Sequence, residues 1–99
     1  MNENLSTPLL LREMLSLRNE EEVRGLMRFF KTGKGQYGEG DQFLGIRVPV
    51  TRDMVKRLWR DTTMLDLEQC IESPWHEVRL GALLVLIQLF KHNKKHRDK

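Results

Sequence analysis

Residues 82–87 form an apolar run, Ala-Leu-Leu-Val-Leu-Ile, inside a segment that the sequence predicts as one long helix from about residue 74 to 92. A surface helix buries one stripe and leaves the opposite face to water, whereas this run is apolar on every side. Such a helix needs neighbours on both flanks, so the chain must pack its other helices around this one. A chain of 99 residues holds too few helices to surround it completely. We therefore expect a further segment or another molecule to complete the packing.

Two helices are predicted before residue 31. Thr7 followed by Pro8 is typical of an N-cap and a first helical residue, because a proline there loses no hydrogen bond. Asn19 is a second N-cap, and we expect Glu22 to bond back to it in a capping box. Apolar residues at helical spacing predict the buried stripes. These are Leu10, Met14 and Leu17 in the first helix and Val23, Leu26, Met27 and Phe30 in the second, which Gly33 would end.

Three more helices are predicted after residue 48. The first runs from about Pro49 or Thr51 to Arg60, and Thr63 with Asp66 caps a short one that follows. The residues 73–74, Ser-Pro, open the long helix described above. The apolar residues expected to be buried in the first two of these are Val55, Leu58, Trp59, Leu67, Cys70 and Ile71. The fold class is therefore all-α, with about five helices in antiparallel pairs. The span 49–92 fits the ~40–47-residue period of HEAT/armadillo-like α-α superhelices, here an incomplete solenoid.

The segment Tyr37–Pro49 lies between the second and third predicted helices and joins a glycine-rich polar stretch to an apolar one. A solvated surface loop has no need of Phe43, Leu44 and Ile46, which stand close together in it. We predict that this loop docks onto the helical core and leaves Arg47 facing outward just before a helix begins.

Arg52, Lys56 and Arg60 recur four residues apart on the third helix, opposite its apolar side. A solvated helix face, partly neutralised by neighbouring aspartates, explains such a row without any function. The alternative is contact with phosphate groups, helped by the amide N–H groups at the start of the helix near Arg47. In that interpretation Arg47, Arg52, Lys56 and Arg60 form one continuous cationic strip.

Other patterns give no convincing site. Gly33–Gly38 matches G-x-G-x-x-G, but a helix precedes it and more loop follows, whereas the dinucleotide fingerprint requires a strand and then a helix. His92 and His96 are one helical turn apart, yet no cysteine or carboxylate cluster completes a coordination set. We expect no metal, no cofactor and no nucleophile activated by a base. Cys70 is expected to be buried and inert.

Charge and cysteine usage bound the environment of the protein. The net charge is +3, but residues 91–99 contribute +4, so the remainder of the chain is not a uniformly basic domain. No apolar run approaches the ~20 residues that span a bilayer, and the first residues show no signal peptide. Cys70 is the one cysteine, which excludes an internal disulfide and suits a reducing compartment. We expect a cytoplasmic protein that does not bind membranes.

Two segments resemble a known family. The segment 37–49, Tyr-Gly-Glu-Gly-Asp-x-Phe-Leu-Gly-Ile-Arg-Val-Pro, resembles the signature of the DNA alkylation repair enzymes, which are glycosylases built from HEAT-like helical repeats. The segment 73–83, Ser-Pro-Trp-His-Glu-Val-Arg-Leu-Gly-Ala-Leu, resembles a later helix of that family. The resemblance extends over about residues 9–93. It implies that residues 1–99 are a single partial domain, the N-terminal helical repeats of this fold.

The resemblance also implies a function. The complete protein would excise purines alkylated at N3 or N7 from double-stranded DNA, and this chain would contribute contacts to the DNA backbone. Arg47 follows the Phe-Leu-Gly-Ile motif directly, at a position that lies on the DNA-facing side in the family. The carboxylate that the family uses for catalysis belongs to later repeats, so we expect the catalytic residues beyond Lys99.

A different class of function is also open: a small helical-repeat module that binds another protein and has no catalytic activity. The exposed flank of helix 74–92 would be its docking surface, and two copies could self-associate through the same flank. Salt distinguishes the hypotheses, because DNA-backbone binding weakens steeply with ionic strength and an apolar interface does not.

Overall fold

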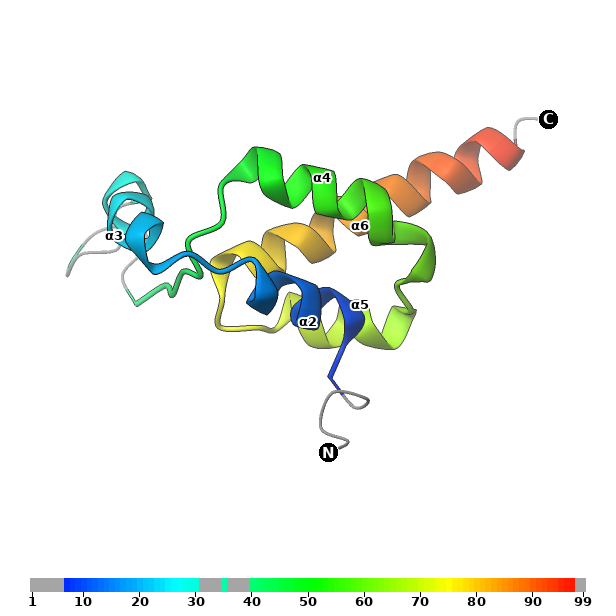
Figure 1. Cartoon of the computed structure of the whole chain (residues 1–99). Helices are drawn as coiled ribbons and strands as arrows, with labels where there is room; N and C mark the ends of the chain where they lie inside the picture. The colour runs from blue at the N-terminus through cyan, green and yellow to red at the C-terminus, as the bar shows by residue number, and fades with distance from the viewer. Residues whose placement is uncertain (1–6, 31–34, 36–39, 98–99) are drawn as a thin grey trace.

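The computed structural model describes residues 7–30, 35 and 40–97, and these residues form α-helices joined by short connections (Figure 1). The helices are α2 (Leu9–Ser16), α3 (Glu20–Phe29), α4 (Val48–Leu58), the 3-10 turn η1 (Trp59–Asp61), α5 (Met64–Ile71) and α6 (His76–Arg97). The described residues contain no strand, only an isolated bridge between Gln42 and Trp75. The predicted all-α fold class is confirmed.

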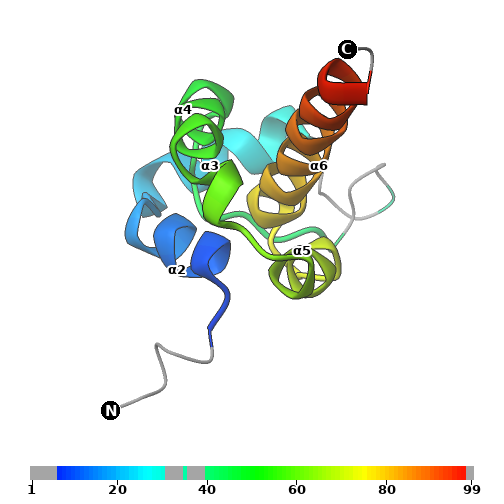
Figure 2. The same ribbon diagram turned by 90° about the vertical axis from the view of Figure 1, so that its right-hand side faces the viewer.

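Four of the helices form two layers, one of α4 and α6 and one of α2 and α5. The helices of one layer run antiparallel to those of the other, so that α2 pairs with α4 and α5 with α6. In Figure 1, α4 and α6 lie above α2 and α5 and run in the opposite direction. Figure 2 shows the same layers from the end, with α2 beside α5 and α4 beside α6. Contacts join α6 to α2, α4 and α5, which makes α6 the centre of the packing. The arrangement is compatible with the predicted superhelix, although two helix pairs are too few to define one.

The hydrophobic core lies along one side of α6. Val78, Ala82 and Val85 are fully buried there. The backbone of α6 comes so close to α2 that a Cβ at Gly81 would lie 3.2 Å from the Sδ of Met14. The rest of the buried cluster comes from the other elements. Its members are Leu10, Met14, Leu44, Ile46, Met54, Val55, Trp59, Leu67 and Cys70.

The other side of α6 is uncovered. Leu83, Ile87 and Phe90 are 52%, 42% and 68% exposed. The sequence predicts neighbours on both flanks of this helix, and the described helices supply them on one flank only.

The capping predictions were right at two helices, except for one detail at Asn19, and wrong at the first helix. Asn19 Oδ1 accepts the amide N–H of Glu21, and Thr63 with Asp66 forms both halves of a capping box. Glu22 does not bond back to Asn19, because the Asn19 N–H donates instead to the Leu44 carbonyl at 2.8 Å. The first helix also begins one residue late, with Pro8 as its N-cap, and α6 extends beyond the predicted end.

The predicted buried stripe of α3 was wrong. No residue of this helix is buried, and Met27 is exposed. The physical reason is that α3 lies apart from the four packed helices, at the left of Figure 1, so its apolar side meets mainly the loop and the first turns of α6. It ends at Phe29, and the predicted terminator Gly33 lies outside the described residues.

None of the described helices is both long enough and apolar enough to cross a membrane.

Candidate nucleic-acid interface

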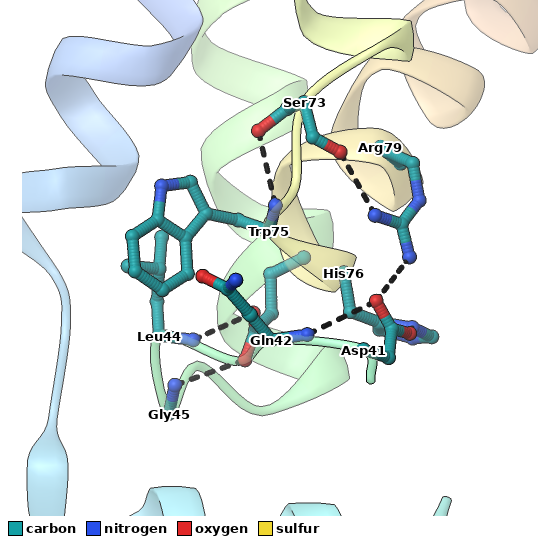
Figure 3. Close-up of polar contacts among 9 residues, drawn as sticks. Asp41, Gln42, Leu44, Gly45, Ser73, Trp75, His76 and Arg79 are labelled. Carbon is teal, nitrogen blue, oxygen red and sulfur yellow. Dashed lines mark hydrogen bonds and ion pairs between the residues drawn. The ribbon is translucent and has the colours of Figure 1, made fainter. Parts of the chain in front are cut away.

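The loop before α4 is fixed to the first turn of α6 by one buried carboxylate. Glu77, which is 2% exposed, accepts hydrogen bonds from the amide N–H groups of Leu44, Gly45 and Ile46 at 2.8, 2.9 and 3.1 Å. Dashed lines in Figure 3 mark the two hydrogen bonds that the amides of Leu44 and Gly45 donate. A buried loop must satisfy its backbone groups, and three successive donors find one acceptor here. The predicted docking of the loop onto the helical core is confirmed.

Asp41 forms a second polar anchor between the loop and α6. Its carboxylate accepts a hydrogen bond from Arg79 at 2.6 Å and lies 3.0 Å from Nδ1 of His76. Arg79 also donates to the Ser73 carbonyl at 2.8 Å, as Figure 3 shows. Burial raises the pKa of Asp41, but the hydrogen bonds and positive charges of Arg79 and His76 outweigh it and hold the pKa below 3.8. The loop and the start of α6 therefore form one polar unit.

An aromatic stack connects the same unit to α3. The ring centre of His76 lies 4.4 Å from that of Phe30 and 4.7 Å from that of Phe43. Phe30 caps the C-terminus of α3, and Phe43 belongs to the loop. The three rings hold the end of α3 against the loop.

Steric constraints require a glycine at position 45, within the Phe-Leu-Gly-Ile motif. Gly45 has φ +89°, and a Cβ built there would lie 1.8 Å from the Asn19 carbonyl oxygen. Neither the backbone conformation nor the space accepts a side chain at this position. This close approach lets Glu77 reach the amides from one side while the start of α3 packs on the other.

Arg47 is the N-cap of α4, and its side chain faces outward, as predicted. The guanidinium is not free, because its Nε and Nη2 donate to the carboxylate of Glu22 on α3 at 2.9–3.1 Å. The side chains are 67% and 34% exposed, so the ion pair lies at the surface. The sequence assigned Glu22 to helix capping and therefore missed this partner.

Arg52, Lys56 and Arg60 are all exposed, and α4 buries Thr51, Met54 and Val55 on its other side. In the part of the chain that the structure describes, no carboxylate forms an ion pair with any of these three cations. The nearby acidic groups are directed elsewhere: Asp53 and Glu13 lie 3.5 and 3.7 Å from nitrogens of Arg57.

Arg60 is also held by an aromatic ring. Its guanidinium carbon lies 4.7 Å from the centre of the Trp59 ring, a cation–π contact. Trp59 itself is buried in the core, as predicted from its place on the apolar side of the helix. Among the described residues, Arg47 therefore has a carboxylate partner, whereas Arg52, Lys56 and Arg60 have none. We call these last three the α4 cationic row; Arg52 and Lys56 lie on α4, whereas Arg60 lies in η1, because the α-helix ends at Leu58 and not at Arg60 as predicted.

Glu77 and Arg79, which position the loop, were not predicted from the sequence. A signal for Glu77 was available, because it stands four and eight residues before Gly81 and Val85, in register with the buried side of α6. A charged residue in an apolar stripe is informative, since it must have partners once it is buried.

An apolar groove borders the uncovered side of α6. It has a volume of about 890 Å³. We call it the α6 groove, and it is lined by Thr62, Met64, Leu86, Ile87, Leu89, Phe90, Lys91, Asn93 and Lys94.

No other chemistry is assembled among the described side chains. Cys70 is buried, and burial with the charge of Asp66 raises the pKa of its thiol to about 11, so it is not a nucleophile near neutral pH. Within residues 7–30, 35 and 40–94, no three His, Cys, Asp or Glu side chains are grouped to hold a metal ion. The side chain of His96 and, apart from Gly35, all of Gly33–Gly38 lie outside the described residues.

Comparison with known proteins adds one match. A family model described as "DNA alkylation repair enzyme" matches residues 10–98, which include every described helix from Leu10 onward and the docked loop. No curated protein and no solved structure matches the chain.

Proposed function

The chain belongs to the DNA alkylation repair enzyme family, and we propose that it supplies helical repeats that bind the backbone of double-stranded DNA. The observation that carries this proposal is the α4 cationic row, three exposed cations on α4 and the η1 turn that follows it, without a carboxylate partner among the described residues. Lys and Arg side chains in such a row contact phosphates without reading sequence. Repair of scattered lesions requires this kind of binding.

Within this proposal, the complete protein removes purines alkylated at N3 or N7 in the cytoplasm. An alkylated base is a good leaving group, so the enzyme mainly stabilises the developing positive charge on the sugar. That task needs a carboxylate, which the family resemblance places in later repeats; Glu22 on α3 and Asp53 on α4 are paired instead with Arg47 and Arg57. We assign no catalytic residue to residues 1–99. The 99-residue chain should release no base from an alkylated duplex, and measurable turnover would contradict this assignment.

The DNA-binding proposal is tested with a triple variant of the row. The chain carrying Arg52→Ala, Lys56→Ala and Arg60→Ala is titrated against a fluorescent 20-bp duplex at several salt concentrations. If each cation meets one phosphate, the slope of log affinity against log salt falls by about 3 and low-salt affinity drops at least about tenfold.

The matched control carries Arg12→Ala, Arg24→Ala and Arg28→Ala, three exposed arginines on α2 and α3. It changes the net charge by the same amount and should retain most of the affinity. Equal losses in the two triple variants would show only a general charge effect and would refute the assignment of the row.

The α6 groove favours the second candidate function, a protein-binding module or self-association. Ile87 and Phe90 expose apolar surface there, and an amphipathic helix could bury it. Sedimentation at increasing concentration tests self-association, with Phe90→Glu as the variant that should abolish it. A mass that stays monomeric at every concentration would exclude self-association.

A further inference from the structure

Arg47, the cation that the family resemblance places toward DNA, is already bound by an acidic side chain. We propose that Glu22 competes with a DNA phosphate for Arg47, so that the first turn of α3 controls whether this arginine takes part in binding. The inference rests on the proposed DNA-binding function and concerns the same surface.

The geometry of the pair supports competition. Nε and Nη2 of Arg47 donate to the two oxygens of Glu22 at 2.9–3.1 Å, using one edge of the guanidinium. A phosphate binds a guanidinium through the same two-pronged arrangement, so a carboxylate that fills this edge occupies the position that a phosphate would take. Both ligands cannot use it at once.

The exposure of the pair makes the exchange possible. With side chains 67% and 34% exposed, Arg47 and Glu22 form their contact in water, where such ion pairs are weak and are screened by salt. A DNA phosphate brings a stronger local field than one carboxylate, and no buried group has to be desolvated when it takes the place of Glu22.

The attachment of α3 points the same way. This helix buries no residue, and its described polar links to the loop are the Asn19 N–H to Leu44 carbonyl bond and the Arg47–Glu22 pair. Phe30 adds the contact with Phe43 and His76 at the other end of the helix. Separation of Glu22 from Arg47 therefore leaves intact the core around α6 and the hydrogen bonds from the loop amides to Glu77.

The test is Glu22→Gln in the full chain, with affinity for a 20-bp duplex measured by fluorescence anisotropy at about 50 mM salt. The amide keeps the size of the side chain but removes the charge that competes with phosphate. We expect binding about two- to fivefold tighter, with a salt slope steeper by up to about 1.

The control is Glu21→Gln, which removes the same charge from the same helical turn without touching Arg47. If Glu21→Gln tightens binding as much as Glu22→Gln, the effect is general electrostatics and the inference fails.

A double-mutant cycle isolates the competition from the DNA-binding proposal. In an Arg47→Ala background, Glu22→Gln should no longer improve binding, because the contested cation is gone. Improvement that persists in this background overturns the inference while leaving the DNA-binding function standing. Absence of any DNA binding in the wild-type chain and in Glu22→Gln at low salt would instead overturn the proposed function, and the inference with it.

Discussion

Two carboxylates hold the same loop from opposite sides and in different surroundings. Glu77 binds three backbone amides from inside the protein, and Glu22 binds Arg47 from outside. Both contacts have good hydrogen-bond geometry. They differ in burial, because the Glu77 side has no water to replace a lost partner, whereas the Glu22 side is open to solvent. Burial, more than geometry, decides which contact is structural and which is available for exchange.

Glu77→Ala should give the largest effect on the inner side of the loop. It leaves the amide groups of Leu44, Gly45 and Ile46 without their acceptor, and we expect the free energy of unfolding to fall by about 3–5 kcal/mol. Urea denaturation followed by circular dichroism measures it. The exposed Glu68 on α5 is the control, with Glu68→Ala expected within ~0.5 kcal/mol of wild type. Similar midpoints for both variants would remove the distinction between buried and exposed carboxylates.

Gly45→Ala probes the same inner side through the backbone. The new Cβ meets the Asn19 carbonyl and the residue must keep a positive φ, so we expect a loss of roughly 3 kcal/mol. Gly40→Ala separates the two causes, because Gly40 also has φ +83° but has nothing within 4 Å of its Cβ position. It should cost only about 1 kcal/mol. Equal costs would mean that the close approach to α3 carries no energy.

Asp41 is more exposed than Glu77 and less exposed than Glu22, and varying the pH tests its contribution to stability. Because the pKa of Asp41 is lowered in the folded protein, its stabilisation is fully present above the ordinary value of 3.8 and is lost as the pH falls through the folded-state value. Asp41→Asn should therefore lower the free energy of unfolding by roughly 1–2 kcal/mol at about pH 6. The difference from wild type should shrink below about pH 4. A difference that is constant with pH would show that the charge of Asp41 is not what stabilises the loop.

Of the loop contacts compared, the Arg47–Glu22 pair should contribute least, so Arg47→Ala should have only a small effect on stability. The exposed pair with Glu22 contributes about 0.2–1 kcal/mol, and raising the salt concentration should reduce this further. Arg52→Ala, which removes a cation without a described partner, is the comparison and should change stability even less. A loss at Arg47 comparable with that of Glu77→Ala would contradict the idea that the outer contact is exchangeable.

The sequence predicted the docking of the loop and the exposure of Arg47, but not the carboxylates that bind them. Apolar residues in a glycine-rich loop predicted docking, and the position of Arg47 before a helix predicted its exposure; both are confirmed. The roles of Glu22 and Glu77 were not predicted, because each binds residues more than twenty positions away in the chain. Local capping rules consider only a few neighbours and assigned Glu22 to Asn19.

The failure at α3 has a related cause. Val23, Leu26 and Phe30 have the spacing of a buried stripe, and they do face a partner. That partner is the loop together with the first turns of α6, which cover less surface than a whole packed helix, so the stripe is only half-buried. Periodicity indicates which side of a helix is apolar, but it does not indicate how much surface will cover that side.

The sequence by itself determined the helices, the cap at Thr63 and Asp66, the burial of Trp59 and Cys70, and an apolar α6 that needs neighbours. These follow from local hydrogen bonding and from periodicity over one or two turns. Only the tertiary structure decided that Glu77 would hold the loop, that Gly45 would lie against Asn19, and that Arg47 would meet Glu22. Those contacts depend on which distant segments the packing around α6 brings together, and on whether water can reach them once they meet.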